Sequence, residues 1–523
     1  MKNLFASSLV FALGFLGAGV AEAGPLEEAA ECLYRGRTPC VERKLNALSE
    51  REQDDPQVKL LKAKLAFYQG RMEEAVTFME AAKTGLPDAF AEGGALANEL
   101  ALMQRTAEVH SGLVETVRGD ITIVHHPGMD RILVDDSVEV LELARERIAP
   151  LLGGDPPIPL RVELYPTGAS LTACTGLPLE AVQTTGVVAI SKWNRLLVTS
   201  PRAMGGGYGW QDTLVHEWIH LVASWHSGDQ APVWLQEGIA KGLDMLWRQP
   251  EFELPVHMQS LLSTALRDDD FVGFEEMHPS FALMDSADRA ALAYAQVATM
   301  MGYLREKSGS DAIARVLQRI EDGEDSQLAV ATVFRAPWSQ FEREWKTWIG
   351  QLDLAEERLS SMPTVLDGQG GEFATDPVLA ARKDLRDKTR LGDLMARRNH
   401  HKAAIVYYEQ AIPEGEPAGP ELVERLAQSL LELDEAERAQ RWLEAVIENY
   451  PEHAGTREML GDRYRIAGQA EAALTQYKAS ADIYPYSPEV QEALIALYKA
   501  LGQLEKAERH QRYLDILNYR DSG

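Results

Sequence analysis

Blocks of similar sequence recur every 34 residues near the C-terminus, and this period restricts the possible folds more than any other feature. Pro451 and Pro485 lie 34 residues apart, and each ends one block. The block between them places large and small residues at Leu460, Gly461, Tyr464, Gly468, Ala473 and Tyr477. The flanking blocks repeat the pattern with Leu426, Leu430, Ala439 and Leu443, and with Leu494, Tyr498, Gly502 and Ala507. Such a period predicts stacked helical hairpins, because one hairpin buries its apolar face only against its neighbours.

This pattern resembles the tetratricopeptide repeat (TPR). A fourth copy begins near residue 385 with Leu391, Gly392, Ala404, Tyr408 and Ala411. The small residues allow paired helices to approach closely, and the large ones fill the gaps between hairpins. We therefore predict a TPR array over residues 385–520, which implies a concave surface for a protein partner. A weaker copy between Pro56 and Pro87 predicts similar hairpins over residues 24–105.

Between the two arrays, the pattern changes to short strands followed by helices. Strands are predicted at Asp120–Val124, Leu160–Tyr165, Gly186–Ile190 and Arg195–Thr199, with a helix at Ser137–Ile148. Residues 211–350 have a mostly helical pattern. We therefore predict an α+β domain at 106–355 and a linker at 356–384, which includes the glycine-rich stretch 362–376. The predicted fold class is a multidomain protein whose α+β domain is flanked by all-α repeats.

The segment from Leu214 to Leu221 contains the motif His216-Glu217-x-x-His220. Two histidines four residues apart lie on one face of a helix, where both imidazoles can hold a single metal ion. Glu217 lies about 100° further around the helix and can reach a water molecule at that ion. A zinc ion lowers the pKa of such water, and the glutamate accepts its proton during attack on a carbonyl carbon. The motif therefore predicts a hydrolytic centre with one Zn²⁺.

Two residues further along the chain are candidates for the third metal ligand. Glu237 follows His220 by seventeen residues, and a second helix packed on the first would bring it to the metal. His226 follows His220 by six residues, but a continuing helix would point it about 120° away from the ligands. The chain has Ala223 where a sharp break would need glycine. We therefore favour Glu237 and predict that His226 is a polar residue at the end of the helix.

Together these residues resemble the gluzincin metallopeptidases. The sequence Trp-Leu-Gln-Glu237-Gly-Ile-Ala is most similar to the aminopeptidase N branch and its relatives, the peptidase MA-like domains. The resemblance implies that His216, His220 and Glu237 bind zinc and that Glu217 is the general base. It also places Tyr294 where aminopeptidase N-type enzymes carry a tyrosine that stabilises the oxyanion of the tetrahedral intermediate.

The resemblance extends to neighbouring segments, with one departure. Phe341-Glu-Arg-Glu-Trp345 is typical of MA-like domains, and the strands at 186–190 and 195–199 resemble a hairpin whose edge can pair with an extended substrate. The Gly-Ala-Met-Glu-Asn segment that recognises a free substrate N-terminus is missing from the sequence. This departure argues against a standard aminopeptidase and leaves endopeptidase activity open.

The N-terminus is typical of an export signal. Lys2, an apolar stretch from Leu4 to Ala18, and Ala21-Glu-Ala23 predict a bacterial-type signal peptide over residues 1–23. The protein would then be periplasmic or extracellular, with no stable membrane insertion after cleavage. An oxidising compartment would allow Cys32 and Cys40 to pair, although two separate buried thiols are the alternative. Cys174 is expected to be a small core residue.

The net charge of the chain argues against two classes of partner. The chain has 52 basic and 80 acidic residues, a formal charge of −28, which disfavours binding to nucleic acid or anionic lipid.

We predict an exported zinc peptidase that cleaves polypeptides and uses its repeats to recruit a protein partner or substrate. One alternative is a TPR scaffold of the cell envelope whose peptidase-like domain is weakly active or inactive. A second is a zinc hydrolase that acts on a non-peptide amide or ester.

Overall fold

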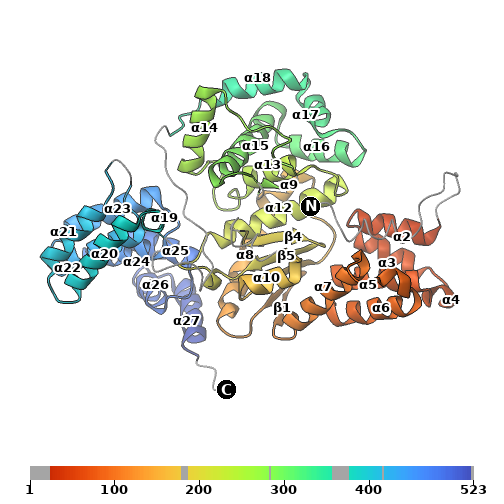
Figure 1. Ribbon diagram of the computed structural model, residues 1–523, viewed down its shortest axis with the longest axis horizontal. Coiled ribbons are helices and arrows are strands. Elements are labelled where there is room, and N and C mark those ends of the chain that lie inside the picture. Colours follow the sequence, from red (N-terminus) through yellow and green to blue (C-terminus); the bar gives the residue numbers. More distant parts are fainter. Residues whose placement is uncertain are drawn as a thin grey trace.

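The computed structural model describes residues 24–177, 187–278, 280–281, 284–355, 376–414 and 417–519. An α+β centre carries a helical array on each side (Figure 1). This architecture confirms the predicted fold class. The predicted signal peptide and the 362–376 stretch, apart from its last residue, lie outside the described residues.

The elements follow one another in three groups. The N-terminal group contains α2 (Pro25–Tyr34), α3 (Thr38–Asn46), α4 (Glu50–Gln53), α5 (Pro56–Tyr68), α6 (Met72–Gly85), η1 (Pro87–Phe90) and α7 (Ala95–His110). The central strands are β1 (Val114–Arg118), β2 (Ile121–His125), β3 (Leu160–Tyr165), β4 (Ala189–Lys192) and β5 (Arg195–Thr199). The central helices are η2 (Met129–Ile132), α8 (Leu133–Arg147), α9 (Ala149–Leu152), α10 (Gly168–Thr175), η3 (Pro201–Ala203), α12 (Trp210–Ser227), α13 (Val233–Leu243), α14 (Val256–Asp268), α15 (Ala287–Ser308), α16 (Ala312–Glu321), α17 (Ser326–Phe334) and α18 (Trp338–Ile349). The C-terminal helices are α19 (Pro377–Ala381), α20 (Lys383–Ala396), α21 (His401–Ala411), α22 (Pro420–Leu431), α23 (Ala436–Asn449), α24 (Ala454–Ile466), α25 (Ala470–Ile483), α26 (Pro488–Ala500) and α27 (Leu504–Asn518).

The strands form a mixed sheet in the order β1-β2-β3-β5-β4. β3 pairs in parallel with both β2 and β5, whereas β1 and β4 are antiparallel to their neighbours. The structure contains β3 and β5 with the predicted bounds, and it contains β2 and β4 shifted by one to three residues. β1 was not predicted, because this edge strand is exposed at nearly every position and lacks an alternating apolar face.

Alternate residues of the central strands enter two different cores. Val162 and Leu164 of β3 face α8 and α12 in the larger core, which also contains α13 and α15. Tyr165 of β3 and Leu197 of β5 face the N-terminal helices in a second core. The sheet is therefore a wall between the motif helix α12 and the N-terminal array.

A buried cluster of charges lies on the N-terminal side of this wall. The Glu163 carboxylate of β3 accepts hydrogen bonds from Arg195 at 2.9 and 3.0 Å, from Arg161 at 2.8 Å and from the Tyr165 hydroxyl at 2.7 Å. His110 of α7 lies 3.4 Å from the same carboxylate. The guanidinium carbon of Arg195 also lies 4.4 Å from the centre of the Phe67 ring of α5. Glu163 thus holds together side chains that belong to the sheet and to the N-terminal array.

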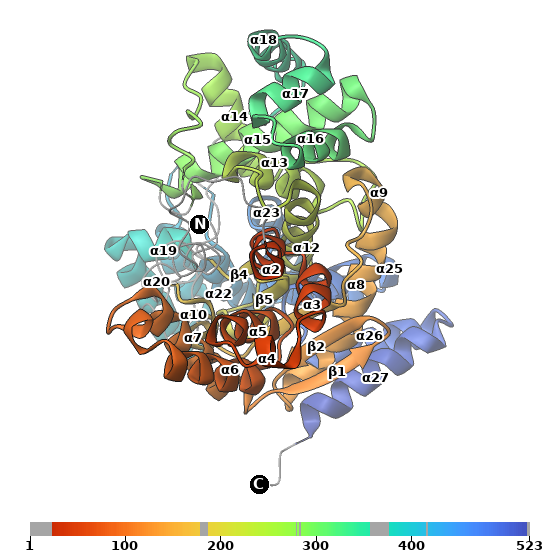
Figure 2. The same ribbon diagram turned by 90° about the vertical axis from the view of Figure 1, so that its right-hand side faces the viewer.

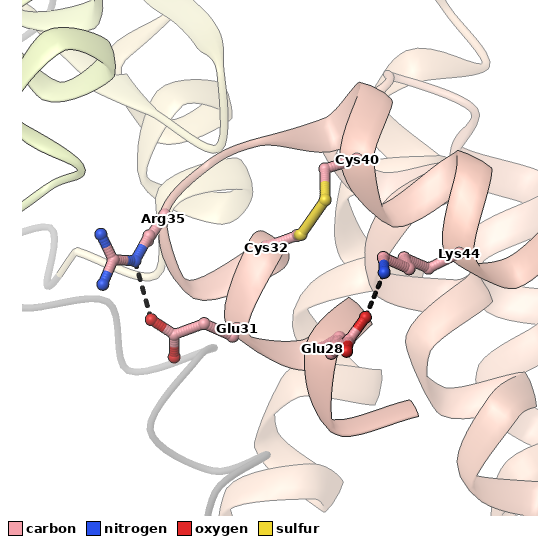
Figure 3. Close-up of a disulfide and its surroundings, with 6 residues drawn as sticks. All are labelled: Glu28, Glu31, Cys32, Arg35, Cys40 and Lys44. Carbon is pink, nitrogen blue, oxygen red and sulfur yellow. Dashed lines mark hydrogen bonds and ion pairs between the residues drawn. A yellow bond between two sulfur atoms is a disulfide. The ribbon is translucent and has the colours of Figure 1, made fainter. Parts of the chain in front are cut away.

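A disulfide joins Cys32 of α2 to Cys40 of α3, which resolves the alternative left open by the sequence (Figure 3). The loop that it closes contacts the central domain at two places. Asn194, in the turn between β4 and β5, donates a hydrogen bond to the Gly36 carbonyl at 2.8 Å. Arg37 pairs with Glu321 of α16 and lies over the Trp225 ring of α12, so α2 and α3 lie beside the motif helix (Figure 2).

The C-terminal helices pack as consecutive pairs, from α20 with α21 to α26 with α27. The glycines at the predicted close-contact positions have the expected role. A Cβ atom on Gly392 would lie 2.4 Å from the Tyr408 ring, and one on Gly461 would lie 2.9 Å from the Tyr477 ring. Each tyrosine hydroxyl donates to the aspartate that follows the glycine, so both pairs of helices are joined in the same way.

The last repeats are docked on the central domain. The Tyr486 hydroxyl, between α25 and α26, lies 2.8 Å from both Asp130 of η2 and Ser200 beside β5. Arg509 of α27 pairs with Asp136 and Glu139 of α8. These contacts join segments more than 280 residues apart in sequence. Among the described residues, none of the helices combines the length and apolar character needed to cross a bilayer.

Candidate metal centre

α12 carries the two motif histidines at the edge of the larger core. Its apolar residues are buried on nearly all sides, and Gly228 ends the helix in the left-handed conformation with φ 59°. His216 and His220 remain partly accessible on one face, as their spacing of four residues requires. Their Nε2 atoms lie 3.1 Å apart. The helix therefore presents two imidazole nitrogens at a single point.

α13 brings Glu237 to the same point. The next residue, Gly238, faces α15 so closely that a Cβ atom would lie 2.8 Å from the Val297 carbonyl oxygen. Glycine is therefore required for the packing that positions this helix. The Glu237 Oε2 atom lies 3.4 Å from Nε2 of His216 and 3.4 Å from Nε2 of His220.

These three atoms have the spacing of a tetrahedral zinc site. Ligand atoms about 2.0–2.1 Å from zinc at tetrahedral angles are separated by about 3.3 Å. The observed separations are 3.1, 3.4 and 3.4 Å. Within the described part of the chain, His216, His220 and Glu237 form the only group of three or more ligand-type side chains that converge in this way. His226 is not part of this group. It lies in the last turn of α12, where its ring forms a hydrogen bond with the Gly154 carbonyl.

Electrostatics inside the centre reflect the close approach of these groups. Burial lowers the pKa of His216, but Asp244 and Glu237 outweigh it and raise that pKa to about 10. Burial raises the pKa of Glu237, but His220 and His216 lower it far below its usual range. The Glu237 carboxylate is therefore charged, whereas His216 would have to release a proton before its ring nitrogen could bind a metal ion.

Glu217 lies beside the three ligands and points toward the sheet edge. Its side chain is buried, and burial raises the pKa of the carboxyl, although His220 and His216 oppose this shift. The backbone of Ser191 in β4 forms a hydrogen bond to it. β4 is an edge strand, so its outer edge and the Glu217 carboxylate border the same space.

Tyr294 of α15 also faces the centre. Burial first, and then the Glu237 and Glu217 carboxylates, raise the pKa of its hydroxyl well above the usual range. The Tyr294 ring packs against Phe281 with centroids 4.7 Å apart. The structure therefore brings together all five residues selected from the sequence.

Sequence reasoning missed Asp244, which supports one of the histidines. The Asp244 Oδ2 atom lies 3.3 Å from Nδ1 of His216 and 3.1 Å from Nζ of Lys241, and the aspartate is buried. A carboxylate at Nδ1 orients the ring so that Nε2 faces the metal. A local signal existed, because Asp244 follows Glu237 by seven residues, which is two helical turns.

Replacement of Asp244 by alanine is expected to weaken zinc binding about 10–100-fold, because His216 loses the partner that orients its ring. The affinity can be measured by competition with a chromophoric chelator. Asp268→Ala, at an exposed position at the end of α14, is the control and should leave the affinity unchanged. Equal zinc affinity of Asp244→Ala and the unaltered protein would show that the carboxylate has no orienting role.

Comparisons with known proteins agree with the character of this centre. Residues 144–351 match the sequence model of the peptidase MA superfamily. This stretch contains α12, α13 and α15, and therefore every residue of the centre. The central region is accordingly a metallopeptidase-like domain. A comparison with curated proteins finds no match.

Solved structures show only weak similarity to the chain as a whole. MamA has a TM-score of 0.23 and 19% identity, over 27% of this chain and 80% of its own. TTC0263, a thermophilic TPR protein of Thermus thermophilus, has a TM-score of 0.22 and 23% identity, over 26% and 74%. Native yeast LTA4 hydrolase has a TM-score of 0.28 and 13% identity, over 77% and 66%. TM-scores this low establish no shared fold for the complete chain.

Proposed function

We propose that this protein is an exported, zinc-dependent peptidase that cleaves polypeptides and engages a protein partner through its helical repeats. The observation that carries the proposal is the triangle of His216, His220 and Glu237 ligand atoms with the Glu217 carboxylate beside it. The match of residues 144–351 to the peptidase MA superfamily supports the same reaction class. Export rests on the signal-like sequence of residues 1–23.

Each residue of the centre has a distinct chemical task. A zinc ion held by His216, His220 and Glu237 would supply Lewis acidity toward water and a substrate carbonyl. Glu217 accepts the proton of the attacking water and transfers it to the leaving amine. Burial raises the pKa of its carboxyl, which makes it a stronger base than an exposed glutamate. The Tyr294 hydroxyl, which remains protonated, donates a hydrogen bond to the developing oxyanion.

The outer edge of β4, which pairs with no other strand among the described residues, offers a place for the substrate backbone. Extended peptides bind exposed strand edges through main-chain hydrogen bonds, and β4 borders Glu217. The repeats would then present a protein partner or substrate to the domain on which α25 and α27 are docked.

Metal content and a peptide-library digest together test the proposal. The unaltered protein should bind one zinc ion per chain and cleave peptides, whereas His216→Ala should lose both properties while keeping its helical content. Zinc can be measured by plasma emission spectroscopy and cleavage by mass spectrometry. A folded protein with neither zinc nor cleavage would refute the peptidase and favour the scaffold alternative. Bound zinc without peptide cleavage would favour a hydrolase for a non-peptide amide or ester.

Tyr294→Phe is expected to lower the turnover number about ten- to a thousandfold and to leave zinc content unchanged, because an oxyanion donor acts mainly in the transition state. Tyr303→Phe is a matched control on the same helix, since its hydroxyl bonds to Glu344 on α18. Steady-state rates of one peptide from the library would be compared for both variants. Unchanged turnover of Tyr294→Phe would assign this residue to the core.

A further inference from the structure

A hollow of about 570 Å³ lies outside the metal centre. It is bounded by the segment before α14, by one face of α15, and by α18 with the residues that follow it. Its α15 residue Arg305 comes eleven positions after Tyr294, which corresponds to about 16 Å along the helix axis. The volume is within the range of sites that bind small molecules.

Hydrogen bonds within the protein hold the walls of this hollow in place. The Gln259 amide donates to the Leu254 carbonyl at 2.7 Å and accepts from the Ala355 backbone N–H at 3.2 Å, so it joins two opposite segments. Trp348 of α18 donates its indole N–H to Glu306 of α15 at 2.8 Å. These bonds fix the positions of Gln259 and Trp348 in the wall, which also includes apolar surface from Phe252, Leu254 and Leu354.

Arg305 is the one basic residue among those that line the hollow. Its side chain is half-buried, and its Nε atom is enclosed without a hydrogen-bond partner. No ion pair or hydrogen bond of its guanidinium occurs among the described residues, and burial lowers its pKa. Unpaired charges of this kind reduce stability and call for a specific reason. An anionic group of a ligand would provide the partner that the chain does not.

Exposed acidic residues of the lining restrict the ligand further. Glu253 and Asp353 line the hollow, are exposed, and form no ion pair among the described residues. Together with Glu306 they give the lining more negative than positive charge, which disfavours phosphate and other polyanions. A ligand with a carboxylate at one end and an ammonium group at the other matches both the arginine and the exposed carboxylates of the lining.

We propose that this hollow binds a free peptide of two or three residues with apolar side chains. Its carboxylate would pair with Arg305, its amino group would face Glu253 and Asp353, and its side chains would pack on Phe252 and Trp348. The binding requires neither a metal ion nor hydrolysis. It can therefore succeed or fail independently of the peptidase function, although a peptidase would release molecules of this kind.

Isothermal titration with the dipeptide Leu-Leu tests the proposal, in full-length protein carrying Glu217→Gln so that the probe is not cleaved. Addition of Arg305→Met should weaken binding about ten- to a hundredfold, because a charged hydrogen-bond pair is lost. Leu-Leu amide should bind the parent protein, which retains Arg305, as weakly as Leu-Leu binds Arg305→Met. Amidation should not weaken binding to Arg305→Met any further, since both changes remove the same contact. N-acetylation should weaken binding in the Arg305 protein, but much less once Glu253→Gln and Asp353→Asn are introduced.

Controls separate this site from the metal centre and from misfolding. Arg267→Met, at an exposed position of α14, should bind Leu-Leu normally. Arg305→Met should melt at the same or a higher temperature than its parent, because it removes an unpaired half-buried charge. Equal affinity of the parent and Arg305→Met for Leu-Leu, or additive effects of amidation and Arg305→Met, would overturn the proposal. So would tighter binding of inorganic phosphate than of Leu-Leu.

Discussion

Glu217→Gln is expected to keep its zinc and to lower the rate of peptide cleavage about 10²–10⁴-fold. Glutamine has nearly the same size and fills the same buried position, so the helix that carries His216 and His220 should remain in place. Its amide cannot accept the proton of the attacking water. The change therefore removes the base and leaves the three metal ligands intact.

The measurement compares zinc content and single-peptide cleavage rates of this variant with those of the unaltered protein. Glu275→Gln, an exposed position in the same domain, is the control and should change neither quantity. Equal cleavage by Glu217→Gln would remove this residue from the mechanism. Loss of zinc together with activity would show instead that Glu217 supports the metal site.

Glu163→Gln is expected to lower the free energy of unfolding by about 3–5 kcal/mol, the typical effect of breaking a buried ion pair by removing one partner. Glu163 and Arg195 are completely buried, and the carboxylate is the shared partner of Arg195 and Arg161. Neutral glutamine would leave two guanidinium groups with too little negative charge around them. Because the cluster also contacts α5 and α7, the N-terminal array should be the first part to unfold.

Glu115→Gln is a matched control, because Glu115 also pairs with Arg161 but is 53% exposed. It should cost no more than about 1 kcal/mol. Both variants can be compared by urea unfolding, with proteolysis to locate the region that opens. Similar small effects of the two changes would contradict a central role for Glu163.

The pH dependence of the free energy of unfolding provides an independent test of the role of Glu163. Burial raises the pKa of Glu163, but Arg195 and His110 outweigh it, so the folded-state pKa lies well below the ordinary value of 4.5. A lowered pKa contributes stability above about pH 4.5 that is lost as the pH falls toward the folded-state value. The difference between the unaltered protein and Glu163→Gln should therefore shrink below pH 4.5.

Much of the architecture could be predicted from the sequence because its signals are local. The 34-residue period and the glycine–tyrosine contacts, such as Gly461 with Tyr477, depend on neighbouring helices. The bounds of β3 followed from alternating apolar residues and those of β5 from a short apolar run, and both strands are buried on both faces. β1 escaped prediction, because an edge strand such as Val114–Arg118 with little burial carries no such pattern.

Some residues of the candidate site could likewise be identified from the sequence, and one was missed. The spacing of four residues places His216 and His220 on one helical face whatever the rest of the chain does. Glu237 was favoured over His226 because a second helix could bring it to the metal, whereas Tyr294 was selected by its resemblance to a family motif. The structure places both at the metal centre. Asp244 was missed, although its distance of two helical turns from Glu237 was a usable signal.

The sequence by itself determined the helical repeats, the α+β centre between them and five of the side chains that converge in it. Only the tertiary structure decided how these parts are joined. Tyr486 meets Asp130 across 356 residues, and Asn194 binds the Gly36 carbonyl across 158 residues. In the described part of the chain, Arg305 lines a hollow without forming an ion pair. Periodicity reports contacts within a few helical turns, whereas these contacts depend on the packing of distant segments. Which buried charged side chains pair with one another can therefore be seen only in the folded structure.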